Sequence, residues 1–222
     1  GKLRMHLILL AKNYEGLKNL IQIHNNSQEE GFYYKPRIDL ELINQYKDNL
    51  ICLTACVASP LGQFYRLKRA KKCAIYLLNL KNIFKDDFYL EIQPGHFKDQ
   101  IAYNDFLAKL AKDFNIELVA TNDIHYLNKA DSSIHNWHVK DCRKYDDIKG
   151  SFIYPDTVYY LMKEEELRAA FYKTEQITES VIKKAINNTL TIADKVDIQI
   201  PEEHFMPVFD ADIDEQQVLS DK

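Results

Sequence analysis

Two patterns of apolar and polar residues alternate along this chain. Short, nearly continuous apolar runs predict strands that are buried on both faces, and they cover residues 5–11, 50–56, 87–93 and 116–123. Stretches whose apolar residues recur at helical spacing follow most of these runs. Strands that alternate with helices indicate βα units around a mostly parallel sheet, either open or closed into a barrel. The predicted fold class is therefore α/β.

The predicted helices include a long one over residues 61–84 and a last one over residues 174–196. Five apolar residues stripe one face of the last helix: Ile177, Val181, Ala185, Ile186 and Leu190. From residue 201 onward the pattern ends in prolines and acidic residues, which is typical of a tail or linker. We therefore expect one domain over residues 1–200 and a linker over residues 201–222.

Composition narrows the class of protein. A chain of 222 residues with 46% apolar and 28% charged residues suits a large globular domain. It has no apolar run of membrane-spanning length and no signal-peptide pattern, so we expect a cytoplasmic protein without a membrane partner. A net charge of −4 means that any contact with nucleic acid must come from a local patch.

Asp123 and His125 are the sharpest local signal for chemistry. They follow the last predicted parallel strand, where α/β barrels place their sites, and on a strand two side chains at this spacing share a face. Such a pair suits Zn²⁺, Mn²⁺ or Fe, although a turn cap with a routine hydrogen bond is the simpler interpretation. Cys56 and His6 lie in other apolar runs, where a core role is the alternative.

Two segments could contact phosphate. The basic stretch from Arg66 to Lys72 spreads its charges around a helix, which favours a solvated face. The loop that contains Tyr34, Lys35 and Arg37 combines aromatic and cationic groups, which suits stacking on bases and contact with phosphates. An ordinary packing loop is the alternative interpretation.

Two segments stand out as motifs: residues 31–39 (GFYYKPRID) and residues 118–127 (LVATNDIHYL). Residues 6–13 (HLILLAKN), 53–56 (LTAC) and 88–93 (FYLEIQ) accompany them. In their order and spacing these segments resemble the PHP (polymerase and histidinol phosphatase) domain of bacterial replicative DNA polymerase III alpha subunits, and the first two weigh most. The resemblance extends from residue 1 to about residue 200.

This resemblance implies a distorted seven-stranded (β/α) barrel, of which the chain would form the C-terminal part, with a divalent metal cluster of Zn, Mn or Fe. The positions that match the family's metal ligands are His6, Cys56, Asp123 and His125. The family's His-x-His motif, its Asp-His pair and its ligand Glu would precede Gly1, so we expect weak or partial metal binding here. Residues 58–60 depart from the Gly and Glu that the family often has after its cysteine.

The resemblance also implies a function. We expect the chain to be part of the catalytic alpha subunit of a DNA-directed DNA polymerase that acts in replication. Its partners would be DNA, deoxynucleotides and other replicase subunits. The carboxylates that bind Mg²⁺ for polymerisation would lie beyond Lys222. The PHP module would be a metal-binding platform or a metal-dependent 3′–5′ exonuclease, and residues 1–222 alone would not polymerise. A free-standing PHP phosphoesterase and a non-catalytic scaffold module are the alternatives.

Overall fold

A four-stranded sheet forms the centre of the protein. The computed structural model describes residues 5–95, 98–143, 158–171 and 176–202. The strands β1 (Ile8–Ala11), β2 (Leu50–Leu53), β3 (Phe88–Ile92) and β4 (Glu117–Ala120) lie side by side in chain order. This mixed α/β architecture confirms the predicted class, and closure into a seven-stranded barrel stays a prediction.

The strands lie where the apolar runs predicted them but are shorter. β2, β3 and β4 are parallel, with Cys52 opposite Phe88 and Val119 opposite Glu91. β1 runs antiparallel to β2. It is an outer strand of the described sheet, so most of its residues are half-buried rather than buried on both faces as expected. His6 precedes β1 and is exposed, which corrects its assignment to the strand interior.

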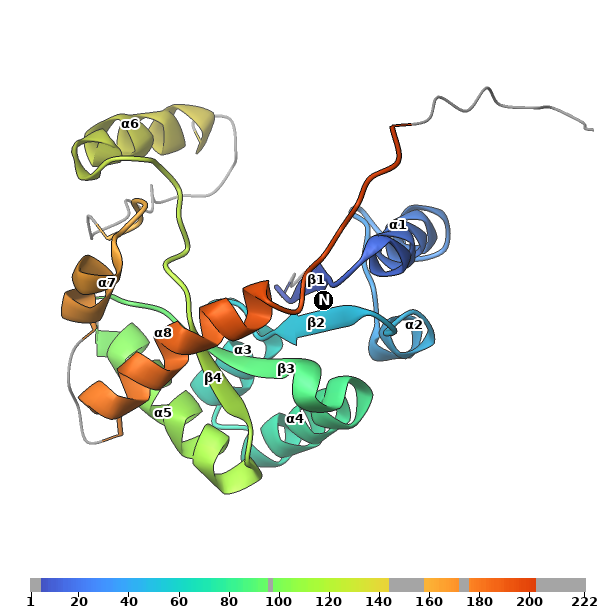
Figure 1. Cartoon of the computed structure of the whole chain (residues 1–222), viewed down its shortest axis with the longest axis horizontal. Helices are drawn as coiled ribbons and strands as arrows, with labels where there is room; N and C mark the ends of the chain where they lie inside the picture. Colours follow the sequence, from blue (N-terminus) through green and yellow to red (C-terminus); the bar gives the residue numbers. More distant parts are fainter. Residues whose placement is uncertain (1–4, 96–97, 144–157, 172–175, 203–222) are drawn as a thin grey trace, which may run out of the picture.

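Helices cover both faces of the sheet (Figure 1). They are α1 (Tyr14–Glu29), α2 (Leu40–Gln45), α3 (Pro60–Arg66), α4 (Ala70–Phe84), α5 (Lys98–Phe114), α6 (Ser132–Arg143), α7 (Glu164–Ala170) and α8 (Glu179–Ala193), with 3-10 turns η1 (Lys85–Asp87) and η2 (Lys129–Asp131). Side-chain caps begin several of them, as when Asn13 accepts a hydrogen bond from the Gly16 N–H and Ser59 from the Gly62 N–H. No helix in these ranges is long and apolar enough to cross a membrane.

Alternate residues of each strand enter different apolar clusters, because neighbouring side chains on a strand point to opposite faces. Ile51, Leu53, Tyr89 and Val119 pack with Ile192 of α8. The opposite face carries Leu50, Cys52, Phe88, Leu90, Ile92 and Ala120 and packs in the main cluster with α4 and α5. Burial on both faces explains why these strands read as continuous apolar runs.

The long helix expected over residues 61–84 is two helices. α3 ends at Arg66, Lys68 adopts a left-handed φ of 52°, and α4 begins at Ala70. The basic residues around this break are exposed, which confirms the solvated interpretation. The last helix is shorter than predicted, and Leu190 is exposed rather than part of its buried stripe. Most of the predicted linker, residues 203–222, lies outside the described ranges.

A carboxylate at the amino end of β3 joins distant parts of the chain. Asp87 Oδ2 lies 2.7 Å from Lys12 Nζ, and Asp87 Oδ1 lies 2.8 Å from Lys195 Nζ. Burial opposes ionisation of Asp87, but the two ammonium groups outweigh it and lower the pKa of the carboxyl. Lys12 follows β1 and Lys195 follows α8, so Asp87 connects the sheet to the helix that covers it.

Candidate functional site

The carboxyl ends of β2, β3 and β4 meet at one edge of the sheet because the three strands are parallel. Thr54 to Cys56 follow β2, Gln93 follows β3, and Thr121 to His125 follow β4. The edge therefore gathers segments that are far apart in the sequence. This is the position in which open α/β sheets and barrels place their chemistry.

Glu91 lies at the centre of this edge and is only 2% exposed. Its Oε2 accepts a hydrogen bond from the Ala55 N–H at 2.9 Å. Its Oε1 accepts hydrogen bonds from Gln93 Nε2, at 3.1 Å, and from Thr121 Oγ1. The Thr54 hydroxyl lies 2.8 Å from the Glu91 backbone N–H. One buried carboxylate thus holds the three strand ends together.

Glu91 was not among the site residues predicted from the sequence. Burial raises the pKa of its carboxyl, the three hydrogen bonds oppose that rise, and the nearby charge of Asp123 adds to it. The sequence did contain a signal, because a lone Glu inside a strand expected to be buried on both faces needs polar partners. Two of its hydrogen-bond donors, Ala55 and Thr121, lie within two residues of Cys56 and Asp123, so its role here is to position those segments.

The structure brings His6 and Cys56 together. The Cys56 Sγ lies 3.7 Å from the His6 Nδ1. Sulfur and nitrogen ligands on one tetrahedral zinc ion are separated by about 3.5 Å, given typical bond lengths. Burial raises the pKa of the Cys56 thiol, the Ala58 N–H partly opposes this, and the charges of Asp123 and Glu91 add to it. The pair therefore has the donor types and spacing of two ligands on one metal.

Asp123 and His125 do not converge by the strand geometry expected from their spacing. β4 ends at Ala120, and Asp123 has a left-handed φ of 50°. Their segment is a loop, in which His125 Nδ1 lies 2.8 Å from the Asp123 backbone oxygen. The His125 ring is exposed and lies 5.4 Å, between centroids, from the Tyr159 ring. The Asp123 charge reaches Cys56 and Glu91, as their raised pKa values reflect.

The described residues supply part of a metal site. Among them, no group of three or more His, Cys, Asp and Glu side chains is arranged to hold an ion. The His6–Cys56 pair has the spacing of two metal ligands, and the Asp123 carboxylate lies nearby. The His125 Nδ1 instead contacts the backbone oxygen of Asp123. Weak or partial metal binding stays a prediction, since affinity depends on ligand number and geometry. The four-residue ligand set itself stays a prediction.

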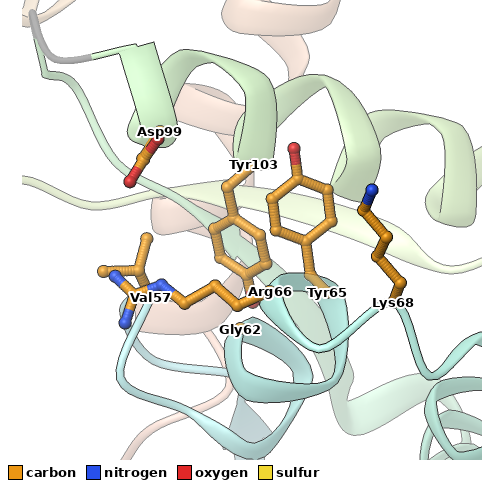
Figure 2. Close-up of a pocket in the computed structure, with 7 residues that line it drawn as sticks. All are labelled: Val57, Gly62, Tyr65, Arg66, Lys68, Asp99 and Tyr103. Atoms are coloured by element: carbon orange, nitrogen blue, oxygen red, sulfur yellow. The ribbon is translucent and has the colours of Figure 1, made fainter.

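A cleft of about 340 Å³ lies beside the Cys56 loop (Figure 2). Val57 forms one wall, and Tyr65 and Tyr103 line it with their rings. Arg66, Lys68 and Asp99 add charged groups to the lining. Tyr103 is buried and its hydroxyl lies 3.2 Å from Ser59 Oγ, so this wall is part of the core.

A larger groove, of about 1120 Å³, includes His6 in its lining. Arg37 lies in the same lining, while Tyr34 and Lys35 are exposed nearby in the chain. The structure therefore places one residue of the loop predicted to contact nucleic acid, Arg37, in a groove that also contains His6. Binding at this loop stays a prediction.

Comparison with known proteins agrees with the motifs. Residues 2–95 match the PHP domain family. The DNA polymerase III subunit alpha of Borreliella burgdorferi is 34% identical over 200 residues, which is 89% of this chain and 17% of that protein. The Thermus aquaticus subunit is 32% identical over 88% of this chain and 16% of that protein. The Aquifex aeolicus subunit is 42% identical over 60% of this chain and 12% of that protein.

The chain thus spans about a sixth of the length of the curated relatives it matches along most of its own length. The match to the PHP family covers the segment from before His6 to beyond Gln93, which includes the His6–Cys56 pair and Glu91. The chain is therefore similar, along about nine-tenths of its length, to bacterial DNA polymerase III alpha subunits, and its residues 2–95 match the PHP domain family. These matches confirm the resemblance inferred from its motifs.

Proposed function

We propose that this chain is the PHP part of a bacterial replicative polymerase alpha subunit and that its strand-end edge binds divalent metal for phosphodiester hydrolysis at DNA 3′ ends. The observation that carries the metal part is the approach of Cys56 Sγ to His6 Nδ1 at 3.7 Å. A divalent metal bound there would supply a Lewis acid and a water of lowered pKa. Asp123 and His125 are the further residues proposed to hold it.

The chain's own residues would prepare this edge. Burial keeps Cys56 as a thiol in the absence of metal, because it raises the thiol pKa. Metal binding at this cysteine would therefore release a proton and strengthen as pH rises. Glu91 would hold the Ala55–Cys56 and Thr121–Asp123 segments at a constant separation through its hydrogen bonds to Ala55 and Thr121. Polymerisation and replicase assembly are proposals that concern the longer protein.

Titration with Co²⁺ tests the metal proposal. We expect thiolate-to-metal absorption in the wild type, and Cys56→Ala should abolish it and weaken binding at least tenfold because the soft ligand is lost. Cys73→Ala is the matched control: this cysteine is buried in α4, and burial raises its thiol pKa to about 11. Unchanged absorption and affinity in Cys56→Ala would contradict the assignment.

Hydrolysis is tested on the full-length protein with a labelled oligonucleotide, Mn²⁺ or Zn²⁺, and a chelator. We expect shortening from the 3′ end that stops with the chelator and is reduced in Cys56→Ala but not in Cys73→Ala. Metal binding without any hydrolysis would favour the scaffold module, in which the metal only stabilises the fold. Hydrolysis that the chelator and Cys56→Ala leave intact would exclude this edge as the reaction site.

A further inference from the structure

Three consecutive aromatic residues protrude from the segment between α1 and α2. Phe32, Tyr33 and Tyr34 have 56%, 57% and 68% of their surface exposed. We call residues 31–37 the aromatic loop, and it also contains Lys35 and Arg37. Single exposed apolar side chains are ordinary, whereas a contiguous group of them indicates a binding surface.

Contacts within the aromatic loop organise these rings. The Tyr33 and Tyr34 ring centroids lie 4.7 Å apart at an interplanar angle of 79°. The Arg37 guanidinium lies 5.0 Å above the centroid of the Tyr33 ring, and the Tyr33 N–H donates to the Lys35 carbonyl at 3.2 Å. Tyr34 has a left-handed φ of 60°, which is unfavourable for an aromatic residue. The loop therefore keeps Tyr33 against Arg37 and holds the Tyr34 ring toward solvent.

Arg37 provides the second observation that indicates a ligand. Its Nε is buried and has no hydrogen-bond partner within the described part of the chain. The Arg37 side chain is only partly buried and lines the groove, so its guanidinium can pair with a phosphate oxygen, the acceptor that it fits best. Asp39 lines the same groove, but its carboxylate caps α2 by accepting the Leu42 N–H at 2.9 Å.

The groove connects Arg37 to the candidate metal edge. Its volume of about 1120 Å³ has room for more than one nucleotide, and its lining includes both Arg37 and His6. Its other walls come from α1, α2, α3 and α4 through Ser27, Ile43, Pro60 and Tyr76. A strand that contacts Arg37 would thus extend toward the His6–Cys56 pair.

We infer that the aromatic loop binds single-stranded nucleic acid, with bases stacked on Tyr34 and Phe32 and phosphates paired with Lys35 and Arg37. Stacking on exposed rings requires unpaired bases, because a duplex keeps its base faces covered. Two cations in a chain of net charge −4 are also too few to attract a duplex strongly. The role of the loop in delivering a 3′ end to the metal edge rests on the proposed function, but the binding itself does not.

The test is fluorescence anisotropy with a labelled short oligothymidine, at low salt and in EDTA. We expect Tyr34→Ala to weaken binding about tenfold, since one base stacked on an aromatic ring contributes roughly that factor. Tyr34→Phe keeps the ring and should retain the affinity. Trp137→Ala removes a ring that is equally exposed, at 68%, on α6 and should leave binding unchanged.

Charge is tested by the salt dependence of the same binding. Lys35→Ala should lower the slope of log K against log salt by about 0.7, the value for one phosphate contact on a single strand. Lys109→Ala, an exposed lysine on α5, should not change it. Equal binding of a duplex, or equal loss in Tyr34→Ala and Trp137→Ala, would overturn the inference. Binding in EDTA needs no metal. Binding that persists there, while the protein fails to hydrolyse the oligonucleotide even with Mn²⁺ or Zn²⁺ present, would refute the proposed function and leave the aromatic-loop site standing.

Discussion

Replacing Glu91 is the most informative perturbation of the strand-end edge. Glu91→Gln preserves the shape of the side chain but exchanges one acceptor oxygen for an NH₂ donor. The carboxylate accepts from three groups, the Ala55 N–H, Gln93 Nε2 and Thr121 Oγ1. The Thr121 hydroxyl and the Gln93 amide can reorient, but the Ala55 backbone N–H cannot. Either orientation of the introduced amide therefore forces a rearrangement or leaves a donor facing a donor.

The expected cost follows from these contacts. One buried donor left without an acceptor costs about 1–3 kcal/mol, so we expect Glu91→Gln to lower the free energy of unfolding by that amount. Glu91→Ala leaves all three donors without an acceptor and also opens a cavity at a position that is 2% exposed. We expect it to cost about 3–5 kcal/mol, which is a large share of the roughly 5–15 kcal/mol that stabilises a typical protein.

Urea denaturation followed by circular dichroism measures both costs. Glu117→Gln is the matched control, because its carboxylate on the neighbouring strand pairs with Lys184 at 2.7 Å but is 49% exposed. An exposed pair contributes about 0–1 kcal/mol. The Ala55 amide should also exchange hydrogen faster in Glu91→Gln. A cost of Glu91→Gln no larger than that of Glu117→Gln, or unchanged exchange of the Ala55 amide, would show that Glu91 does not hold this edge together.

Two further predictions concern stability away from Glu91. The pKa of Asp87 is lowered, so its pairs with Lys12 and Lys195 stabilise the fold above about pH 4, and this stabilisation is lost as the pH falls below that value. Asp87→Asn should therefore lower the free energy of unfolding by about 1 kcal/mol at neutral pH and leave it unchanged at acid pH. Urea titrations at a series of pH values measure both. A cost that does not change with pH would contradict this account. Gly62→Ala should destabilise the protein by about 1–3 kcal/mol, because the added Cβ would lie 2.1 Å from the Val57 carbonyl oxygen. The same exchange usually stabilises a helix, so a lower melting temperature would be specific to this contact. An increase in melting temperature would show that the Val57 loop can move.

The order and class of the elements were predictable because both faces of the central strands are covered. Burial on both faces produces the continuous apolar runs from which β2, β3 and β4 were predicted. The break between α3 and α4 was not predictable in this way, because Lys68 adopts its left-handed φ without glycine or proline nearby. The direction of β1 depends on its pairing with β2, which no local pattern in residues 5–11 encodes.

The candidate site was partly predictable. His6 and Cys56 were both selected from the sequence, and the structure brings them within 3.7 Å of each other. The same-face argument for Asp123 and His125 was wrong, because it assumed a strand and Asp123 has a positive φ after β4 has ended. Glu91 was missed because its importance depends on hydrogen bonds to residues 36 and 30 positions away in the chain.

The position of Asp87 has a consequence for the order of folding. Its partners Lys12 and Lys195 are 75 and 108 positions away, and contacts of such large sequence separation form late and slowly. During synthesis the sheet would emerge well before α8, whose Ile192 packs against Ile51, Tyr89 and Val119. Until that helix arrives, one apolar face of the sheet is uncovered and prone to aggregation. The nascent chain should therefore depend on chaperone protection until residue 195 has left the ribosome.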